Sequence, residues 1–337
     1  MENTIYIFDT SSIVKNAPIL EVSYYHTFPT NGLHKFNDEL LEVYGQMKPG
    51  DIAVACFDGS YSKLRRKAIY PYYKINKKIP GFDNVVNPEI AESSAIAHHL
   101  SLLDADTQKK VILRKGSTIQ LDYLKLVLPL MGINILYQED LEVYDFIYSV
   151  CMKFGTAYNV VIYSDNSDLY DCMAYCDEFK MISASNDEEL SLHIGENINK
   201  IFEGKISDNI PSLSSHITGN KLNILQTAIT TGAEPITTLY DNDRLIIEYL
   251  LTEEDCIMLQ TNYKLVIPVI NSDLELDVTP ISITELANYL SSLEFNEALD
   301  DLGYNTPFIN DEVQALRDYA FALVPSYVKA FYASNQL

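Results

Sequence analysis

The chain has 337 residues and is 47% apolar, which is enough for a sizeable core in one large or two modest domains. No run approaches the roughly 18 consecutive apolar residues that span a bilayer, and no signal-peptide pattern opens the chain, so we expect a cytoplasmic protein without a membrane partner. The formal net charge of −23 argues against a generally DNA-binding surface, because such surfaces depend on cations that neutralise phosphates.

Four short apolar runs are typical of buried strands in a parallel sheet. They are Ile5 to Phe8, Asp51 to Phe57, Ile133 to Tyr137 and Asn159 to Tyr163. The stretch from Leu141 to Phe154, between the third and fourth runs, has the apolar periodicity of an amphipathic helix. Strands that alternate with helices predict an α/β fold, with a parallel central sheet flanked by helices.

A basic stretch follows the second run, and no acidic residue lies between Ser60 and Phe82. Its cations are Lys63, Arg65, Arg66, Lys67, Lys74, Lys77 and Lys78. Charge acts within about a Debye length, roughly 8 Å at physiological salt, so this stretch can bind phosphates although the whole chain is acidic. The tyrosines among the cations suit stacking on splayed bases. The alternative is a solvated, lysine-rich helix face.

The remaining segments are expected to be mostly helical. Residues 84–131 look amphipathic and would form an excursion between the second and third strands. Short helices and turns dominate from residue 198 to about residue 242, where Asp208-Asn209-Ile210-Pro211 is a turn signal. Beyond residue 243 the chain is acidic and helical, with one further strand expected at Tyr263 to Ile270.

Aspartates follow three of the predicted strands, as Asp9, Asp58 and the SDNSD run of residues 164–168. Ligands of such sheets bind beyond the carboxyl ends of the strands, so these side chains would meet at one edge. Carboxylates held close together repel one another, and oxygen ligands of this kind suit Mg²⁺ or Mn²⁺. Two such ions roughly 3.5 to 4 Å apart can hydrolyse a phosphodiester. A single aspartate is more typical of a helix cap or a turn, so the prediction depends on their joint placement.

Five segments, in order, resemble the 5′ nuclease and flap endonuclease family, and most of all its T-even phage members, which remove RNA primers. They are IFDTSSIV, ACFDGSYSKLRRKAIYPYYKINKK, LEVYDFIYSV, VVIYSDNSDLYD and GKISDNIPSL, within about residues 5 to 225. The resemblance implies a PIN-like nuclease core at residues 1–197, with a helical arch at about 60–131. It further implies a helix-three-turn-helix DNA-binding module at 198–242, followed by an acidic helical C-terminal region at 243–337.

The resemblance also implies a set of metal ligands. The first ion would take Asp9, Asp58, Glu142 and Asp145. The second would take Asn166, Asp168 and Asp208, with Asp165 or Glu203 as replacements. At this second position the chain departs from the family, because Asn166 and Lys205 stand where aspartates are usual. Lys205 either substitutes its ammonium group for a cation or points to solvent.

Catalytic and DNA-binding roles follow from the same resemblance. The catalytic set would be Asp9, Asp58, Glu142, Asp145 and Asp168, with Lys74 neutralising the scissile phosphate. The DNA-binding set would be Arg65, Arg66, Tyr70, Tyr73, Lys74, Lys77, Lys78, Gly219 and Lys221. The last two belong to a hairpin that would present backbone amides to duplex phosphates and could hold K⁺. Its spacing differs from the family's, so an ordinary turn between helices is the alternative.

The leading interpretation is a metal-dependent 5′-3′ exonuclease and flap endonuclease that acts on 5′ flaps or RNA-primed DNA in phage replication or repair. The alternative from another class is a catalytically weakened relative that binds branched DNA or a replication protein without cutting. A third interpretation is an RNA-directed nuclease of the related PIN-domain class, whose members usually lack the arch and the SDNIP-type module.

Overall fold

The computed structural model describes residues 3–17, 24–25, 28–29, 31–48, 50–74, 133–213 and 220–276, together with parts of 117–131. Most of the predicted arch, from residue 75 to residue 116, lies outside this part of the chain, as do residues 214–219 of the predicted hairpin and residues 277–337. No helix in the described ranges is both long enough and apolar enough to cross a membrane.

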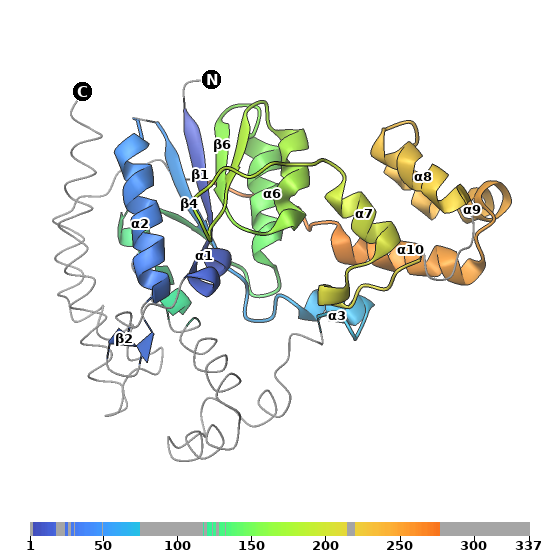
Figure 1. Ribbon diagram of the computed structural model, residues 1–337, viewed down its shortest axis with the longest axis horizontal. Coiled ribbons are helices and arrows are strands. Elements are labelled where there is room, and N and C mark those ends of the chain that lie inside the picture. The colour runs from blue at the N-terminus through green and yellow to red at the C-terminus, as the bar shows by residue number, and fades with distance from the viewer. Residues whose placement is uncertain are drawn as a thin grey trace, which may run out of the picture.

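A five-stranded parallel sheet forms the centre of the fold (Figure 1). Its strand order is β5-β4-β1-β6-β7, so β1 lies in the middle, with Ile7 paired to Val54 on one side and to Ile162 on the other. The strands are β1 (Thr4–Asp9), β4 (Ile52–Cys56), β5 (Asn134–Leu136), β6 (Asn159–Tyr163) and β7 (Phe179–Ile182). Four of them match the predicted runs, and the predicted parallel sheet is confirmed.

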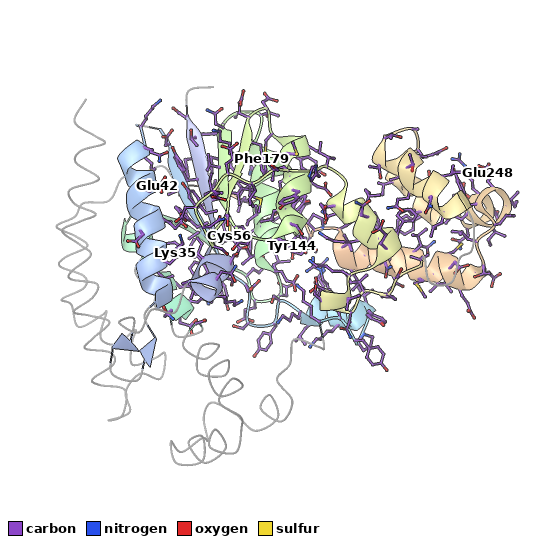
Figure 2. The ribbon with its side chains drawn as sticks, in the orientation of Figure 1. Lys35, Glu42, Cys56, Tyr144, Phe179 and Glu248 are labelled. Atoms are coloured by element: carbon purple, nitrogen blue, oxygen red, sulfur yellow. The ribbon has the colours of Figure 1, made fainter. Side chains whose placement is uncertain are left out.

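Helices cover both faces of this sheet. Alternate residues of a strand point to opposite faces. Ile5 and Ile7 of β1 accordingly pack in one cluster with α6 (Val143–Phe154), while Phe8 packs against Phe36 of α2 (Asn31–Gln46), with tilted rings whose centroids are 5.3 Å apart. Figure 2 shows the side chains that fill these layers. The smaller elements nearby are α1 (Thr10–Asn16), β2 (Tyr24–Tyr25), β3 (Phe28–Pro29), η2 (Leu128–Met131) and η3 (Ser167–Tyr175).

A second hydrophobic core lies beside the sheet and is built mainly from helices. Its elements are α7 (Glu196–Glu203), η4 (Ile206–Asp208), α8 (Asn220–Thr230), η5 (Ile236–Tyr240), α9 (Asn242–Tyr249) and α10 (Glu253–Val266), and α3 (Leu64–Ile69) packs on α10. Asn262 of α10 donates hydrogen bonds to the carbonyl oxygens of Ile201 (2.9 Å) and Pro211 (2.8 Å). The predicted boundary between residues 242 and 243 therefore falls inside one packed core.

The strand predicted at Tyr263 to Ile270 is wrong, because α10 runs through Val266. A capping box between Thr252 and Asp255 begins this helix by satisfying its first free backbone amides. Pro268 sets its end, since the residue before a proline is disfavoured in the helical conformation. Of the apolar residues that suggested a strand, Tyr263, Leu265, Val266 and Ile267 instead pack into the second core, while Val269 packs against the core on the sheet side.

Candidate functional site

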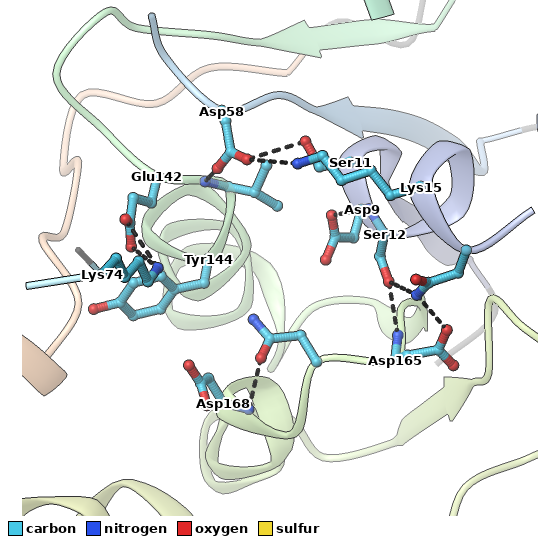
Figure 3. Close-up of a pocket in the computed structure, with 13 residues that line it drawn as sticks. Asp9, Ser11, Ser12, Lys15, Asp58, Lys74, Glu142, Tyr144, Asp165 and Asp168 are labelled. Carbon is cyan, nitrogen blue, oxygen red and sulfur yellow. Dashed lines mark hydrogen bonds and ion pairs between the residues drawn. The ribbon is translucent and has the colours of Figure 1, made fainter. Parts of the chain in front are cut away.

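A cleft of about 280 Å³ opens at the carboxyl edge of the sheet (Figure 3). Its polar lining comes from the residues that follow three strands, from α1, from the start of α6 and from Lys74. The place of the cleft is the one expected for a parallel sheet. Of the predicted metal ligands, the cleft brings together Asp9, Asp58, Glu142, Asp165, Asn166 and Asp168. Asp145 and Asp208 do not line it. We call Asp9, Asp58 and Glu142 the first carboxylate group, and Asp168 and Asp208 the second carboxylate group.

Asp9 ends the central strand β1 and is the N-cap of α1. One carboxylate oxygen accepts the backbone N–H of Ser12 (3.0 Å), and the other accepts the hydroxyl of Ser164 (2.7 Å). Burial raises the pKa of Asp9 to about 6, and the neighbouring charge of Asp58 adds to that rise. Both hydrogen bonds favour the ionised form but do not offset the burial. Asp9 therefore carries a negative charge that its surroundings leave largely uncompensated.

Asp58 follows β4 and faces Asp9 across the cleft. Gly59 fixes its place, because a Cβ at that position would lie only 2.1 Å from the carbonyl oxygen of Gln138. The close approach lets Asp58 accept the backbone N–H of Val143 at the start of α6 (3.1 Å), and it also accepts the hydroxyl of Ser11. Burial alone would raise the pKa of Asp58, but Lys15 and the Val143 hydrogen bond more than offset it, so the pKa lies below its usual value.

Glu142 is the N-cap of α6 and is buried. The ammonium of Lys74 lies 3.0 Å from each of its carboxylate oxygens, and the hydroxyl of Tyr73 donates to one of them (3.2 Å). Lys74 has the left-handed φ of 52°, and its backbone N–H donates to the carbonyl oxygen of Asp208 (2.8 Å). Lys74 thus contacts the first carboxylate group through its side chain and the second through its backbone.

Asp145 belongs to the same helix end, but its side chain points away from the cleft into a fully buried site. Its oxygens accept from the guanidinium of Arg66 twice (2.8 and 3.1 Å) and from the backbone N–H groups of Glu142 (2.9 Å) and Val269 (2.8 Å). Four donors fill the lone pairs of one carboxylate. In this structure Asp145 holds the helix end that presents Glu142, and no lone pair remains for a metal ion.

Arg66 was predicted to contact DNA, but the structure buries it at 2% exposure. Its guanidinium pairs with Asp145 and lies over the ring of Tyr144, 4.6 Å from the ring centroid, while its Nε donates to the carbonyl oxygen of Leu265 (3.0 Å). Tyr144 also donates its hydroxyl to the carbonyl oxygen of Val266 (3.0 Å). Arg66 is therefore a structural cation, because its planar fork suits a buried carboxylate.

Asp165 and Asn166 line the cleft but are held by neutral partners. One Asp165 oxygen accepts the hydroxyl of Ser183 (2.6 Å), and the other accepts the amide of Asn16 (2.8 Å) and the hydroxyl of Ser185. Burial alone would raise the pKa of Asp165, but these hydrogen bonds favour the ionised form more strongly, so the pKa lies below its usual value. The side-chain amide oxygen of Asn166 accepts the backbone N–H of Asp168 and caps η3.

The second carboxylate group is paired with two lysines. One Asp168 oxygen accepts from the ammonium of Lys200 and from that of Lys205 (2.7 Å), and Lys205 also lies 3.3 Å from Asp208. Burial would raise the pKa of Asp168, but the two ammonium groups outweigh it and lower the pKa to about 2. Of the two interpretations of Lys205, the structure supports the inward one, since this side chain is only 25% exposed.

The remaining predicted DNA contacts divide by exposure. Arg65 is exposed and Tyr70 is half-buried, while Tyr73 is buried against Glu142. Tyr61 and Tyr72 are exposed, at 55% and 58%. Lys77, Lys78 and Gly219 lie outside the described residues, and Lys221 is described only by its place in α8. The basic stretch therefore combines buried structural residues with an exposed outer face.

Sequence reasoning missed several residues of the site. Ser164 and Lys15 support the first carboxylate group, and Lys200 supports the second. A signal for Lys200 was available, because Asn197 and Lys200 share the α7 face that buries Ile201, where a polar residue needs a partner. In the described part of the chain, no three carboxylate, imidazole or thiol groups stand close enough to form a metal site as they are arranged here.

The parallel sheet and its acidic edge define an α/β domain of the resolvase-like nuclease type. Residues 4–198, more than half of the chain, match the family model described as the 5′-3′ exonuclease N-terminal resolvase-like domain. The chain therefore belongs to the 5′-3′ exonuclease family, as the sequence motifs predicted. A comparison with curated proteins gives no match.

Several solved structures from bacteriophage T5 are similar to this chain. The T5 D15 protein co-crystallised with metal ions is 12% identical, over 97% of this chain and 99% of that chain, with a TM-score of 0.46. The D15 flap endonuclease in a pseudo-enzyme–product complex with DNA and metal ions is 13% identical, over 96% and 99%, with a TM-score of 0.45. The T5 5′-exonuclease with bound zinc is 13% identical, over 95% and 99%, with a TM-score of 0.43.

Proposed function

We propose that this protein is a metal-dependent 5′-3′ exonuclease and flap endonuclease that hydrolyses phosphodiester bonds of flap or RNA-primed DNA during phage replication or repair. The observation that carries the proposal is the first carboxylate group, in which Asp9, Asp58 and Glu142 from three separate elements line one cleft. Membership of the 5′-3′ exonuclease family supports the same reaction class. An intracellular location belongs to this proposal.

The donor type of the first carboxylate group suits a hard divalent cation, Mg²⁺ or Mn²⁺. Its donors are carboxylate oxygens, which such ions prefer, and the raised pKa of Asp9 reports negative charge that a cation would neutralise. Asp9, Asp58 and Glu142 would hold the ion, and Asp145 would keep the start of α6 in place. The bound ion would lower the pKa of a water and so supply the nucleophile. Lys74, whose ammonium reaches the cleft, would neutralise charge on the scissile phosphate.

The outer face of α3 is the proposed DNA contact. Arg65 supplies a positive charge, and Tyr61 and Tyr72 supply exposed rings on which unpaired bases could stack. Among the similar T5 structures, the D15 flap endonuclease was solved in complex with DNA and metal ions. The predicted hairpin with Gly219 and Lys221, and K⁺ bound there, complete the proposal as duplex anchors. A contact with a replication protein belongs to it as well.

The test is cleavage of a 5′-labelled flap substrate with Mg²⁺ or Mn²⁺, comparing the wild type with Asp58→Asn. Asn keeps the size of the side chain but removes the charge, so we expect a loss of at least about 10²-fold, since a metal centre contributes several kcal/mol of transition-state stabilisation. Asp243→Asn on the exposed surface of α9 is the matched control and should cut normally. Cleavage by Asp58→Asn at the wild-type rate would refute the proposal.

The second carboxylate group gives one reason to keep a binding function as the alternative. Because Lys200 and Lys205 neutralise Asp168, this side of the cleft lacks the free carboxylates of a two-metal site. A protein that binds flap DNA tightly, yet gives no product with either metal ion, would be a branched-DNA-binding module. Preferential cleavage of unstructured RNA over flap DNA would instead indicate a nuclease of the PIN-domain class.

A further inference from the structure

We propose that the second carboxylate group binds no divalent ion, because the ammonium groups of Lys200 and Lys205 occupy its place. This inference rests on the proposed function, in which the first carboxylate group holds the one divalent ion of the site. It describes a nuclease cleft with one exchangeable metal ion and one built-in pair of cations.

The charges of this cluster balance without a metal ion. Asp168 and Asp208 contribute two negative charges, and Lys200 and Lys205 contribute two positive charges within hydrogen-bonding or ion-pair distance of them. The side chains of Lys200 and Asp208 are 9% and 3% exposed, so water screens this cluster only weakly. A divalent ion added here would be repelled by two fixed ammonium groups.

Packing and backbone hydrogen bonds also fix the positions of Lys200 and Lys205. Lys200 lies on the buried face of α7, beside Ile201 and Phe202 of the second core. Lys205 precedes η4, and its backbone forms a two-way bridge with Ile210, with both hydrogen bonds 3.0 Å long. Expelling either ammonium from Asp168 would therefore bury an unpaired charge or move a packed element, each of which is unfavourable.

No neighbouring carboxylate takes over the lost ligand role. Asp165 is engaged by Ser183 and Asn16, and its Oδ atoms accept three hydrogen bonds from neutral donors. Asn166 caps η3 with its side-chain amide oxygen. Glu203, the other expected replacement, accepts from Gln226 (3.2 Å) in an exposed contact on the helical side. Each candidate ligand for a second ion thus has another partner in this structure.

The experiment counts bound ions by titrating the full chain with Mn²⁺ and following free Mn²⁺ by electron paramagnetic resonance. We expect one ion per chain in the wild type, lost in Asp9→Asn and retained in Asp168→Asn. We expect a second ion in the double variant Lys200→Gln with Lys205→Asp, which restores an acidic pair without cations. Lys180→Asp, at an exposed ion pair on β7, is the control for added surface charge and should bind one ion.

Two ions in the wild type would overturn this inference and leave the proposed function intact. One ion that is lost in Asp168→Asn but retained in Asp9→Asn would also overturn it. A double variant that is folded by circular dichroism yet binds only one ion would show that the lysines do not exclude the second. No bound ion in the wild type would overturn the metal-dependent function itself, and the inference with it. The wild-type count does not depend on the folding of any variant.

Discussion

The first and second carboxylate groups lie at the same edge of the sheet but are neutralised differently. Asp9 in the first group accepts hydrogen bonds from neutral donors, the Ser164 hydroxyl and the Ser12 backbone N–H, and burial raises its pKa to about 6. Its neighbours in that group are paired with cations, since Lys15 lies 3.7 Å from Asp58, and Lys74 and Arg66 lie 3.0 and 3.4 Å from Glu142. Asp168 in the second group accepts from two lysines, and its pKa falls to about 2 although burial opposes that fall. A cation bound in the cleft would therefore offset the charge of Asp9, whereas the charge of Asp168 is already offset by two lysines.

The largest expected effect on stability comes from removing Arg66, the cation that holds Asp145 at the helix start next to Glu142. Arg66→Met leaves Asp145 buried without its partner, so we expect a loss of about 3 to 5 kcal/mol in the free energy of unfolding, measured in urea. The neighbouring exposed Arg65→Met is the matched control and should change it by less than about 0.5 kcal/mol. Equal effects of the two substitutions would contradict the buried position of Arg66.

The pH dependence of Asp9 gives the next largest effect. Because burial raises its pKa to about 6 in the folded state, folding favours the protonated form, and the stability due to this group falls as pH rises from about 4 to 6. In metal-free buffer at pH 7, Asp9→Asn should be more stable than the wild type by up to about 3 kcal/mol. The advantage should vanish near pH 4. An advantage that persists at pH 4 would point to some cause other than ionisation.

The stability contribution of Asp168 should change with pH in the opposite direction to that of Asp9. Its two lysines lower the folded-state pKa to about 2 against the effect of burial, so its contribution is present above about pH 4 and is lost as pH falls toward 2. We expect Asp168→Asn to be less stable than the wild type by about 2 kcal/mol at pH 7, with the difference shrinking under acid. Thermal unfolding across this pH range measures the stability of Asp9→Asn and Asp168→Asn against the wild type. If Asp168→Asn became more stable at pH 7, the pairing described here would be wrong.

The smallest expected effect concerns Lys74, whose backbone links the two groups. Lys74→Ala and Lys74→Gly both remove the ammonium from Glu142. The difference between their free energies of unfolding therefore reports the backbone strain at the left-handed φ of 52°. Glycine adopts this conformation without the Cβ clash, so the glycine variant should be more stable by about 1 kcal/mol. Urea unfolding of the pair decides the point. An alanine variant at least as stable as the glycine variant would show that the backbone is unstrained there.

Much of the fold could be predicted from the sequence, because its main signals are local. The apolar runs before Asp9 and Asp58 read as buried strands, and their joint ending at one edge follows from parallel pairing. The strand Phe179–Ile182 was missed, since it is short and carries an exposed lysine at Lys180. The strand predicted at Tyr263 to Ile270 was wrong because the apolar residues in its first half belong to a helix that packs into the second core.

The site was less predictable, because its decisive contacts join residues far apart in the chain. Arg66 looked like one more cation of a basic stretch, and its burial depends on Asp145, 79 positions away, and on the Leu265 carbonyl, 199 positions away. Periodicity could place Glu142 and Asp145 on one helix end but not show that their side chains point to different surroundings. Lys205 drew notice as a substitution, whereas its partnership with Lys200 needed the packing of α7.

Arg66 also bears on how the chain unfolds. Its guanidinium holds Asp145 at the start of α6, on the sheet side, while its Nε holds the Leu265 carbonyl in α10, within the helical core. Separating the two cores would leave Arg66 and Asp145 as unpaired buried charges. The sheet and the helical core should therefore melt cooperatively, in a single calorimetric transition whose van't Hoff and measured enthalpies agree.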